Sequence, residues 1–105
     1  MNTNVFEGGP NEKWKKINGY PAYSISSRGR VRNDDTDTIL RPDGVLKKRA
    51  LCVKLRNDDG IKKFTIAKLV ANEFIPNENN SKNIIHKNKN RLDNRVENLR
   101  WSQEK

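Results

Sequence analysis

The sequence HKNKNRLDNRVENLRW runs from His86 to Trp101 and contains the single histidine of the chain. The two isoleucines at 84–85 indicate a short strand that carries His86 at its end. A loop rich in asparagine follows, and Asn98 then lies next to an apolar cluster that ends at Trp101. A histidine held at the end of a strand can act as a general base, and a nearby amide can orient its ring. We therefore take His86 and Asn98 as the candidate catalytic residues.

Other interpretations of this segment stay open. A lone histidine in a basic chain is usually neither a base nor a metal ligand, and here it could also cap a helix. Leu99 and Trp101 are most simply core residues. We expect Asn90 and Asn94 to hold the loop backbone through their amides, whereas for Asn98 structure and catalysis are evenly balanced.

The composition favours a nucleic acid as partner. Among 105 residues, 22 Lys and Arg stand against 13 Asp and Glu, which gives a formal charge of +9 and a pI near 9.9. A field of this sign concentrates polyanions, although proteins with ribosome-associated or membrane-surface roles would show the same excess, as would an ordinary solvated surface. Only 32% of residues are hydrophobic, so we expect one small domain with a modest core.

The cysteine content and the lack of long apolar segments predict a soluble, intracellular protein. Cys52 is the only cysteine, so neither a disulfide nor a cysteine-type zinc site can form within the chain. No stretch has the length and apolar character of a signal peptide or a membrane span. We expect the protein in the cytoplasm, which would be that of the host cell if the source is viral.

The first half of the sequence predicts short strands and loops. Residues 1–12 should form a flexible lead-in, because Asn, Gly, Pro and Glu dominate them. Over 14–32 the pattern predicts two short antiparallel strands joined by a tight turn at 26–29. Residues 33–44 should form a loop, with a short edge strand at 39–40.

A clearer hairpin and a helix follow. Apolar and basic residues alternate over 51–56, turn residues occupy 57–60, and a second strand should cover 61–65. Thr65 can cap a helix over 66–75, in which apolar residues recur at helical spacing. The proline that comes next ends this helix.

Two groups of cations are candidate DNA-binding residues. Arg28, Arg30 and Arg32 are spaced by two, so on an extended strand they would project from one face. Such a row can clamp successive phosphates or read guanine edges, although a solvated strand face is the plain alternative. Lys47 and Lys48 would extend the same footprint, although each taken alone is more often an ordinary surface charge.

Two segments together resemble a known pair of domains. The first, WKKINGYPAYSISSRGRVR over 14–32, is similar to a nuclease-associated modular domain that precedes HNH nucleases in phage and other mobile elements. The second starts with the Leu51 hairpin, includes KLVANEFIPN over 68–77 and ends with His86 and the NLRW of 98–101. It resembles the HNH domain of homing-type endonucleases, so the two resemblances together extend to the C-terminal end.

The resemblance implies an α+β fold with two parts. A small β-hairpin module would occupy residues 13–45, and an HNH endonuclease-like domain would occupy 46–105. The second part would combine a hairpin and helix with an incomplete ββα-metal, or His-Me finger, motif. Members of this family nick or cut duplex DNA with a divalent ion, usually Mg²⁺ or Mn²⁺. By resemblance His86 takes the place of the general base, and Asn98 that of the residue that supports the loop and its histidine.

The sequence departs from the family pattern at the metal site. Relatives carry an acidic residue directly before the histidine, where this chain has Ile85, and often a histidine at the position of Ala67. A further ligand normally lies on a helix after Asn98, at a place just past Lys105. We therefore expect a truncated finger and assign no residue as a metal ligand. Apolar side chains near Trp101 would lack the cover of that helix, so we expect a fraying end unless a homodimer, another partner or another segment covers it.

Three functional hypotheses result. The first is an HNH homing-type endonuclease of double-stranded DNA, with Mg²⁺ or Mn²⁺ held weakly by Asp93, Asn98 or a second chain. The second is a DNA-binding remnant that does not cut, because the expected ligands are missing. The third is a basic RNA-binding module, with Tyr20, Tyr23 and Phe64 as its only stacking platform. The sequence leaves open whether the chain is an active enzyme.

Overall fold

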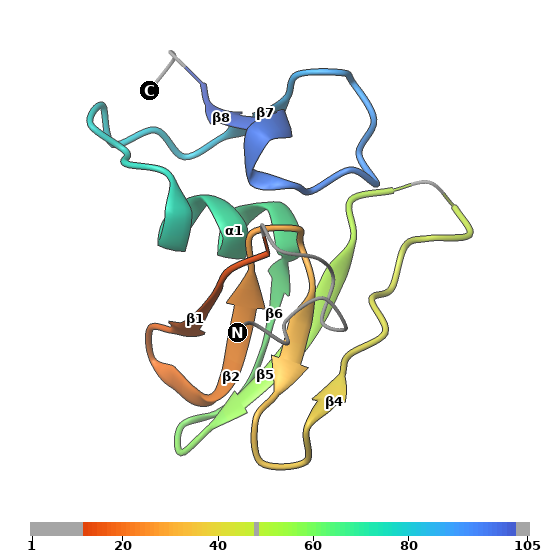
Figure 1. The fold of residues 1–105 in the computed structure, drawn as a ribbon, viewed down its shortest axis with the longest axis vertical. Coiled ribbons are helices and arrows are strands. Elements are labelled where there is room, and N and C mark those ends of the chain that lie inside the picture. Colours follow the sequence, from red (N-terminus) through yellow and green to blue (C-terminus); the bar gives the residue numbers. More distant parts are fainter. Residues whose placement is uncertain (1–11, 48, 103–105) are drawn as a thin grey trace, which may run out of the picture.

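The computed structural model describes residues 12–47 and 49–102 (Figure 1). The flexible segment expected at 1–12 lies outside the described residues, except for Glu12. The α-helix separates a larger β-rich half, which contains the N-terminal strands, from a small ribbon formed near the C-terminus. The expected α+β class is confirmed.

A four-stranded antiparallel sheet occupies the N-terminal part of the chain. Its strands, in spatial order, are β1 (Trp14–Ile17), β2 (Tyr20–Ser26), β3 (Val31–Asn33) and β4 (Thr38–Ile39). The tight turn expected at 26–29 is present, since the N–H of Gly29 donates to the carbonyl oxygen of Ser26 at 3.0 Å. The sequence missed the reversal between β1 and β2. That reversal uses Gly19, whose φ of 85° is a left-handed conformation that glycine adopts without strain.

The hairpin predicted from alternation is formed by β5 (Cys52–Asn57) and β6 (Gly60–Thr65). Gly60 leaves its turn with a φ of 123°, as the turn residues of the sequence indicated. Val53 and Leu55 are buried and alternate with exposed residues. One face of the hairpin therefore packs on the rest of the protein, while the other carries charged side chains into solvent.

Helix α1 covers Ile66–Phe74 and ends one residue earlier than predicted. Thr65 caps it as expected, because its side-chain oxygen accepts a hydrogen bond from the N–H of Lys68 at 3.2 Å. The chain leaves helical geometry at Ile75, directly before the proline. The buried side of the helix consists of Ile66, Ala67, Leu69, Val70 and Ala71.

A small ribbon follows the helix. It is formed by β7 (Ile84–His86), a 3₁₀ turn η2 (Val96–Asn98) and β8 (Leu99–Trp101). The strand that carries His86 at its end is confirmed, whereas β8 was too short to recognise from its sequence. Of the expected covers near Trp101, another segment of the chain is the one present: Leu99 and Trp101 are 2% and 9% exposed, and the Trp101 indole N–H donates to the Ile75 carbonyl oxygen. The helix buries these side chains, so they need no partner chain.

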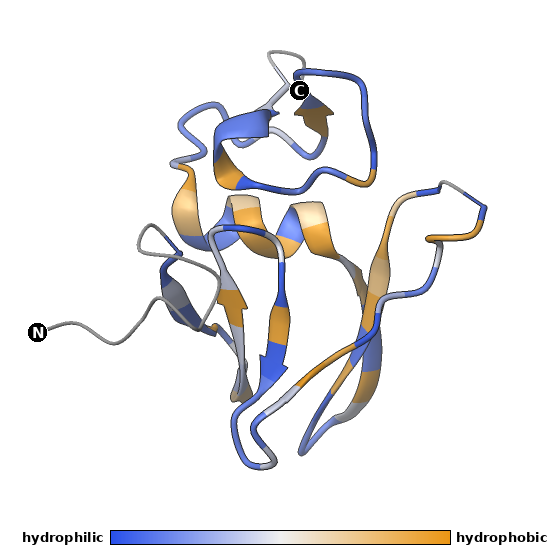
Figure 2. Ribbon diagram, turned by 45° about the vertical axis from the view of Figure 1, so that its right-hand side comes forward, coloured by the Kyte–Doolittle hydropathy of each residue, from blue (hydrophilic) through white to orange (hydrophobic). Residues whose placement is uncertain are grey.

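One continuous apolar core joins these elements. Ile25 of β2, Leu55 of β5 and Val70 of α1 are 0% exposed, and Leu99 of β8 belongs to the same cluster. Figure 2 shows hydrophobic residues concentrated along the helix and the strands beside it. The division of the chain at residue 45 stays a prediction, since both parts contribute to this core.

No helix in the described part of the chain is long and apolar enough to cross a membrane.

Candidate active site and nucleic-acid surface

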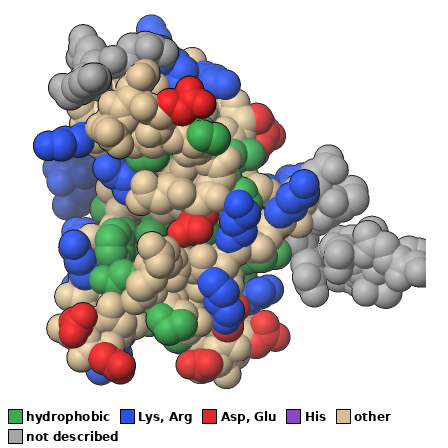
Figure 3. Space-filling view, turned by 90° about the vertical axis from the view of Figure 1, so that its left-hand side faces the viewer, with side chains coloured by type: hydrophobic (Ala, Val, Ile, Leu, Met, Phe, Trp, Pro, Cys, Tyr) green, Lys and Arg blue, Asp and Glu red, His purple; other side chains and the backbone are tan. Residues whose placement is uncertain are grey.

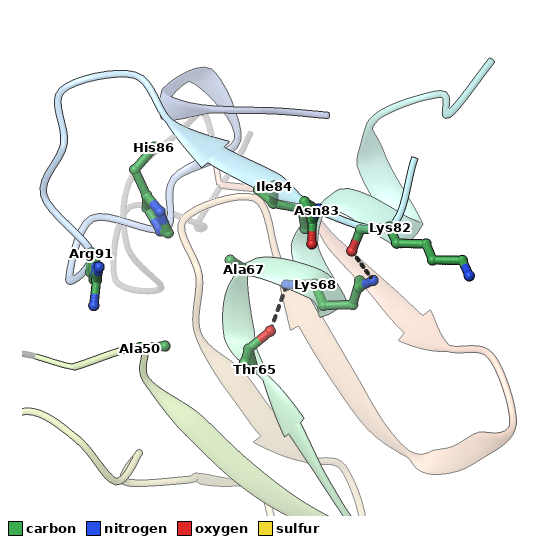
Figure 4. A pocket seen from close by; sticks show the side chains of 9 residues that line it. All are labelled: Ala50, Thr65, Ala67, Lys68, Lys82, Asn83, Ile84, His86 and Arg91. Atoms are coloured by element: carbon green, nitrogen blue, oxygen red, sulfur yellow. Dashed lines mark hydrogen bonds between the residues drawn. The ribbon is translucent and has the colours of Figure 1, made fainter. Parts of the chain in front are cut away.

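His86 extends from the end of β7 into a pocket of about 390 Å³ (Figure 4). Its walls include Ala50, Ala67, Lys68, Lys82 and Arg91. These residues come from the loop before β5, the start of α1 and the segments on either side of His86. Pairing of His86 with Leu99 of β8 holds the strand end in place. The pocket therefore combines one titratable side chain with a basic wall.

A buried amide orients the His86 ring. Nε2 of His86 lies 2.7 Å from Oδ1 of Asn94, and Asn94 is only 4% exposed. An amide oxygen can only accept a hydrogen bond, so in neutral histidine this contact places the ring proton on Nε2. The unprotonated Nδ1 is then able to accept a proton. The sequence had assigned Asn94 to loop structure, and it is instead the residue that contacts the ring.

Asn98 holds the loop rather than the ring. Its Oδ1 accepts from the N–H of Asn88 at 3.1 Å, and its Nδ2 donates to Asn88 Oδ1 at 3.0 Å. The same Nδ2 donates to the carbonyl oxygen of Asp93 at 2.8 Å. Asn98 is 6% exposed, so its loss would leave buried polar groups without partners. A catalytic role for Asn98 stays a prediction.

The N-terminal sheet supports this loop through the turn at Gly29. A Cβ at Gly29 would lie 2.9 Å from Cβ of Asn94 and 3.0 Å from its carbonyl oxygen. The N–H of Val96 donates to the carbonyl oxygen of Ser27 at 2.8 Å, which ties the same turn to the loop. The turn between β2 and β3 therefore presses against Asn94 and, through it, supports His86. Nothing in the sequence indicated this contact, because it joins distant segments.

The negative charge of Asp93 is balanced within the loop by the guanidinium group of Arg95. Arg95 donates to its two carboxylate oxygens at 2.8 Å each, and Asn88 donates to one of them at 3.0 Å. Hydrogen bonds from Arg95 outweigh burial and lower the pKa of Asp93 to about 2. Its carboxylate is therefore ionised and already bound to a guanidinium group.

The described residues do not fit a complete divalent-metal site. Within 12–47 and 49–102, no group of three or more His, Cys, Asp or Glu side chains could hold an ion. Ile85 precedes His86, Ala67 is a small apolar wall of the pocket, and Asp93 faces Arg95. Hard cations prefer carboxylate and other oxygen ligands, which this set does not supply together. We therefore derive no reaction step through a metal held by these residues alone.

Arg30 and Arg32 form ion pairs with carboxylates of the same chain. Arg30 donates to the two carboxylate oxygens of Glu12 at 2.9 and 2.7 Å, and Arg32 donates to Asp34 at 2.9 Å. Both guanidinium groups lie over the ring of Trp14, 5.3 and 4.3 Å from its centroid. Such contacts stabilise the sheet and leave these charges partly neutralised.

The carboxylates that bind them are ionised at neutral pH. Burial raises the pKa of Asp34, but hydrogen bonds from Lys16, Ser24 and Arg32 prevail and lower it to about 2. Burial also raises the pKa of Glu12, and the paired guanidinium group lowers it below its usual value. In Figure 3, basic and acidic side chains are mixed on the visible face of the molecule.

The predicted row of three arginines on one face is present only in part, because Arg30 and Arg32 lie over the same Trp14 ring whereas Arg28 does not belong to a strand. Arg28 is exposed in the turn before Gly29, and β3 begins only at Val31. A spacing of two places side chains on one face only within an extended strand. Contact of the arginines with DNA stays a prediction. Lys47 is exposed in the loop before β5, and Lys48 lies outside the described residues.

Several cations lie near His86; Arg49 and Lys63 are among the residues that could extend the footprint from sequence alone, whereas the sequence interpretation missed Arg41, Lys82 and Arg91. Lys82 and Arg91 line the His86 pocket, while Arg41, Arg49 and Lys63 line a neighbouring hollow. Within the part of the chain that the structure describes, their side chains form no ion pair and no cation–π contact. The nearness of two of them to the histidine in sequence was a usable signal. The hollow itself depends on long-range packing.

Family models match nearly all of the described chain. A model described as the NUMOD4 motif matches residues 12–67, and one described as HNH endonuclease matches residues 69–105. Two relatives from Acanthamoeba polyphaga mimivirus, uncharacterized HNH endonucleases L245 and L247, are 34% identical over 90 residues and 37% identical over 94. Each match covers 86% of this chain, which spans only 27% and 23% of those relatives.

A solved structure is also similar. It is titled "DNA binding and cleavage by the HNH homing endonuclease I-HmuI", and it matches with a TM-score of 0.76 at 29% identity. The match covers 86% of this chain and 52% of that one.

Proposed function

Because this chain belongs to the family of HNH homing endonucleases, with a NUMOD4 motif before its HNH segment, we propose that it binds duplex DNA and hydrolyses a phosphodiester bond. One observation carries the proposal. The ring of His86 is held by Asn94 at 2.7 Å on the wall of a pocket with basic side chains. A base fixed in this way, beside groups that attract phosphate, supplies two of the elements that hydrolysis of a phosphodiester uses.

His86 is the proposed general base. Its Nδ1 takes a proton from a water molecule as that water attacks the phosphorus atom. The bond between phosphorus and the leaving oxygen then breaks, and the leaving oxygen takes up a proton from solvent. A positioned base of this kind accelerates a reaction by about 10²–10⁴-fold. Asn94 keeps the ring in the tautomer that this step needs.

The wall of the pocket supplies positive charge for the phosphate. Arg91 lines it on the side of His86 and has no ionic partner among the described residues, whereas the side chain of Lys82 extends away from His86 (Figure 4). Lys68 is held more firmly, because its Nζ donates to the carbonyl oxygen of Lys82 at 2.9 Å. Guanidinium and ammonium groups in such a pocket would stabilise the charge on the phosphate oxygens.

HNH nucleases are in general metal-dependent, and we propose Mg²⁺ or Mn²⁺ as the ion for this chain. The described residues do not complete a ligand set for it. Oxygen atoms from elsewhere, such as those of the DNA phosphate or of a second chain, would have to complete the coordination. A homodimer is accordingly part of the proposal only as a source of ligands.

The same shortage of ligands favours a second candidate function. A protein that keeps the NUMOD4 motif and the unpaired cations, but lacks the ligands for an ion, would bind DNA without cutting it. The two candidates make opposite predictions for cleavage and the same prediction for binding.

Conversion of supercoiled plasmid to the nicked or linear form tests the proposal. The protein is incubated with Mg²⁺, with Mn²⁺ and with EDTA, and DNA retardation is measured in parallel. We expect nicking that depends on the ion and falls by about 100-fold or more in His86→Ala. Asn90→Ala is the matched control, because its side chain only binds the backbone of the same loop at Leu92.

Each result decides between the candidates. Nicking that persists unchanged in His86→Ala contradicts the assigned base. An intact plasmid that is nevertheless retarded supports the DNA-binding protein without cleavage. Retardation that structured RNA competes away more strongly than duplex DNA would favour the RNA-binding alternative instead.

A further inference from the structure

A second hollow, of about 920 Å³, lies beside the His86 pocket. Ala50 lines both, so the two are adjacent. The charged side chains that line the second hollow are Arg41, Asp43, Lys47, Arg49 and Lys63. Only one of these is acidic. Positive charge therefore prevails in the hollow, so a polyanion that occupies the pocket can continue into it.

The loop that forms this hollow is closed on itself and anchored to β5. The N–H of Arg49 donates to the carbonyl oxygen of Gly44 at 3.0 Å. At the base of the loop, Asp43 and Cys52 exchange two backbone hydrogen bonds of 2.9 and 3.1 Å. Gly44 has a φ of 102°, and a Cβ there would lie 2.7 Å from the Ala50 carbonyl oxygen. The described residues at the base of the loop are therefore held in place, and their close approach depends on glycine.

An apolar side chain stands at the tip of this loop. Leu46 is 98% exposed, and its neighbour Val45 is 45% exposed. Every other leucine of the chain is buried or half-buried in the structure. A lone exposed leucine needs no explanation by itself, but this one is presented by an anchored loop between basic side chains. That setting combines phosphate-binding charge with an apolar projection.

We propose that Leu46 is a wedge that enters the minor groove of duplex DNA and partly unstacks two adjacent base pairs beside the His86 pocket. Arg41, Arg49 and Lys63 hold the phosphates on either side of it. Proteins that kink DNA commonly insert an apolar side chain between base steps while cations bind the backbone. Distortion next to the pocket would bring a phosphate toward His86. The inference rests on the proposed binding of duplex DNA and adds how the duplex is deformed.

The charge of the loop argues for DNA as the occupant of this surface rather than a second copy of the chain. The chain carries a formal charge of +9, and the hollow concentrates positive charge around Leu46. Two positively charged surfaces of this kind repel each other, whereas the negatively charged backbone of a DNA duplex attracts them.

A change in DNA topology tests the wedge without knowledge of the target sequence. Closed circular plasmid is bound by the full chain carrying His86→Ala, so that cleavage cannot relax it. The complex is treated in EDTA with a topoisomerase that needs no metal, the protein is removed, and the linking number is measured. Partial unstacking should lower the linking number in proportion to the bound protein.

Three further variants in the same background isolate the side chain. Leu46→Ala should lose the shift in linking number at equal bound protein, and Leu46→Phe should keep it. Ile61→Ala is the matched control, since Ile61 is also an exposed apolar residue, at 59%, but lies outside the hollow. It should leave the shift unchanged. Equal thermal unfolding of the variants shows that the exposed substitutions spare the fold.

The outcomes separate the wedge from the proposed hydrolysis. An equal shift with Leu46→Ala, or no shift with the parent while it retards DNA, overturns the wedge. A shift that depends on Leu46, in a protein whose wild type never nicks, supports the wedge and contradicts hydrolysis. Absence of any DNA retardation overturns both.

Discussion

Arg30 and Arg32 bind carboxylates within the protein and lie over Trp14, whereas Arg41 and Arg49 form no ion pair within the described residues. Three of these four arginines lie in loops or turns, and Arg32 lies in the short strand β3. The first pair stabilises the sheet, and the second pair leaves its charge available to a polyanion. The sequence shows where the arginines are along the chain. Only the fold shows which of them form ion pairs with carboxylates.

The turn at Gly29, where the N-terminal sheet meets the loop that carries Asn94, gives the largest expected effect on stability. In Gly29→Ala, the new Cβ would meet Asn94 at 2.9 Å while the backbone is at a φ of 85°. We expect a loss of about 2–3 kcal/mol in the free energy of unfolding, measured by urea titration. Gly19→Ala is the matched control, because Gly19 has the same φ of 85° and nothing within 4 Å.

The control should lose only about 1–2 kcal/mol, which is the cost of the left-handed backbone. Equal losses in the two variants would mean that the turn does not support Asn94.

Arg32 tests the neutralised side of the comparison. Arg32→Ala removes the ion pair to Asp34 and the contact with Trp14. We expect a loss of about 1–2 kcal/mol in the free energy of unfolding, with unchanged DNA retardation by the folded protein. A variant of full stability that binds DNA more weakly would assign Arg32 to the DNA surface instead.

Arg49 tests the unpaired side in the opposite way. Its guanidinium group has no ionic partner among the described residues, so Arg49→Ala should change the free energy of unfolding by less than about 0.5 kcal/mol. The slope of log affinity against log salt concentration should fall by about 1, as expected for one lost phosphate contact. Fluorescence anisotropy with a mixed-sequence duplex at several salt concentrations measures this slope. An unchanged slope would remove Arg49 from the DNA footprint.

Acid titration tests the charge of Asp34, which binds Arg32. The pKa of Asp34 falls from 3.8 to about 2 in the folded state, so folding favours its ionised form. Its contribution is therefore complete above about pH 4 and is lost as the pH falls through 2. After allowance for solvent screening, we expect about 1 kcal/mol between wild type and Asp34→Asn at pH 7, and a much smaller difference near pH 2. Urea unfolding from pH 7 to pH 2 measures it, and a difference independent of pH would contradict the ionic origin.

The elements that could be predicted are those with local signals. Alternation indicated the hairpin of β5 and β6, and helical spacing with Thr65 as cap indicated α1. The isoleucines before His86 placed it at the end of a strand. Each of these features depends on residues close together in the chain.

The features that were missed depend on contacts between distant segments. Asn94 was read as a loop residue because nothing in its sequence neighbourhood showed that its amide meets the His86 ring. Its support by Gly29, and the pairing of Arg30 with Glu12, likewise join parts that no local pattern connects. The hollow beside the pocket arises only when the loop at Leu46 closes against β5. Contacts between distant segments therefore determine the geometry of the site, and the spacing of residues in the sequence does not show them.

Where the duplex lies on the protein is measured most directly by protection of lysines from acetylation. The protein is acetylated with and without a mixed-sequence duplex at low salt, and the extent at each lysine is read by mass spectrometry. We predict protection of Lys63 and Lys82, which line the hollow and the His86 pocket, and none of Lys16, which is bound to Asp34. Protection of Lys16 while Lys63 and Lys82 remain reactive would contradict the account and place the DNA on the N-terminal sheet.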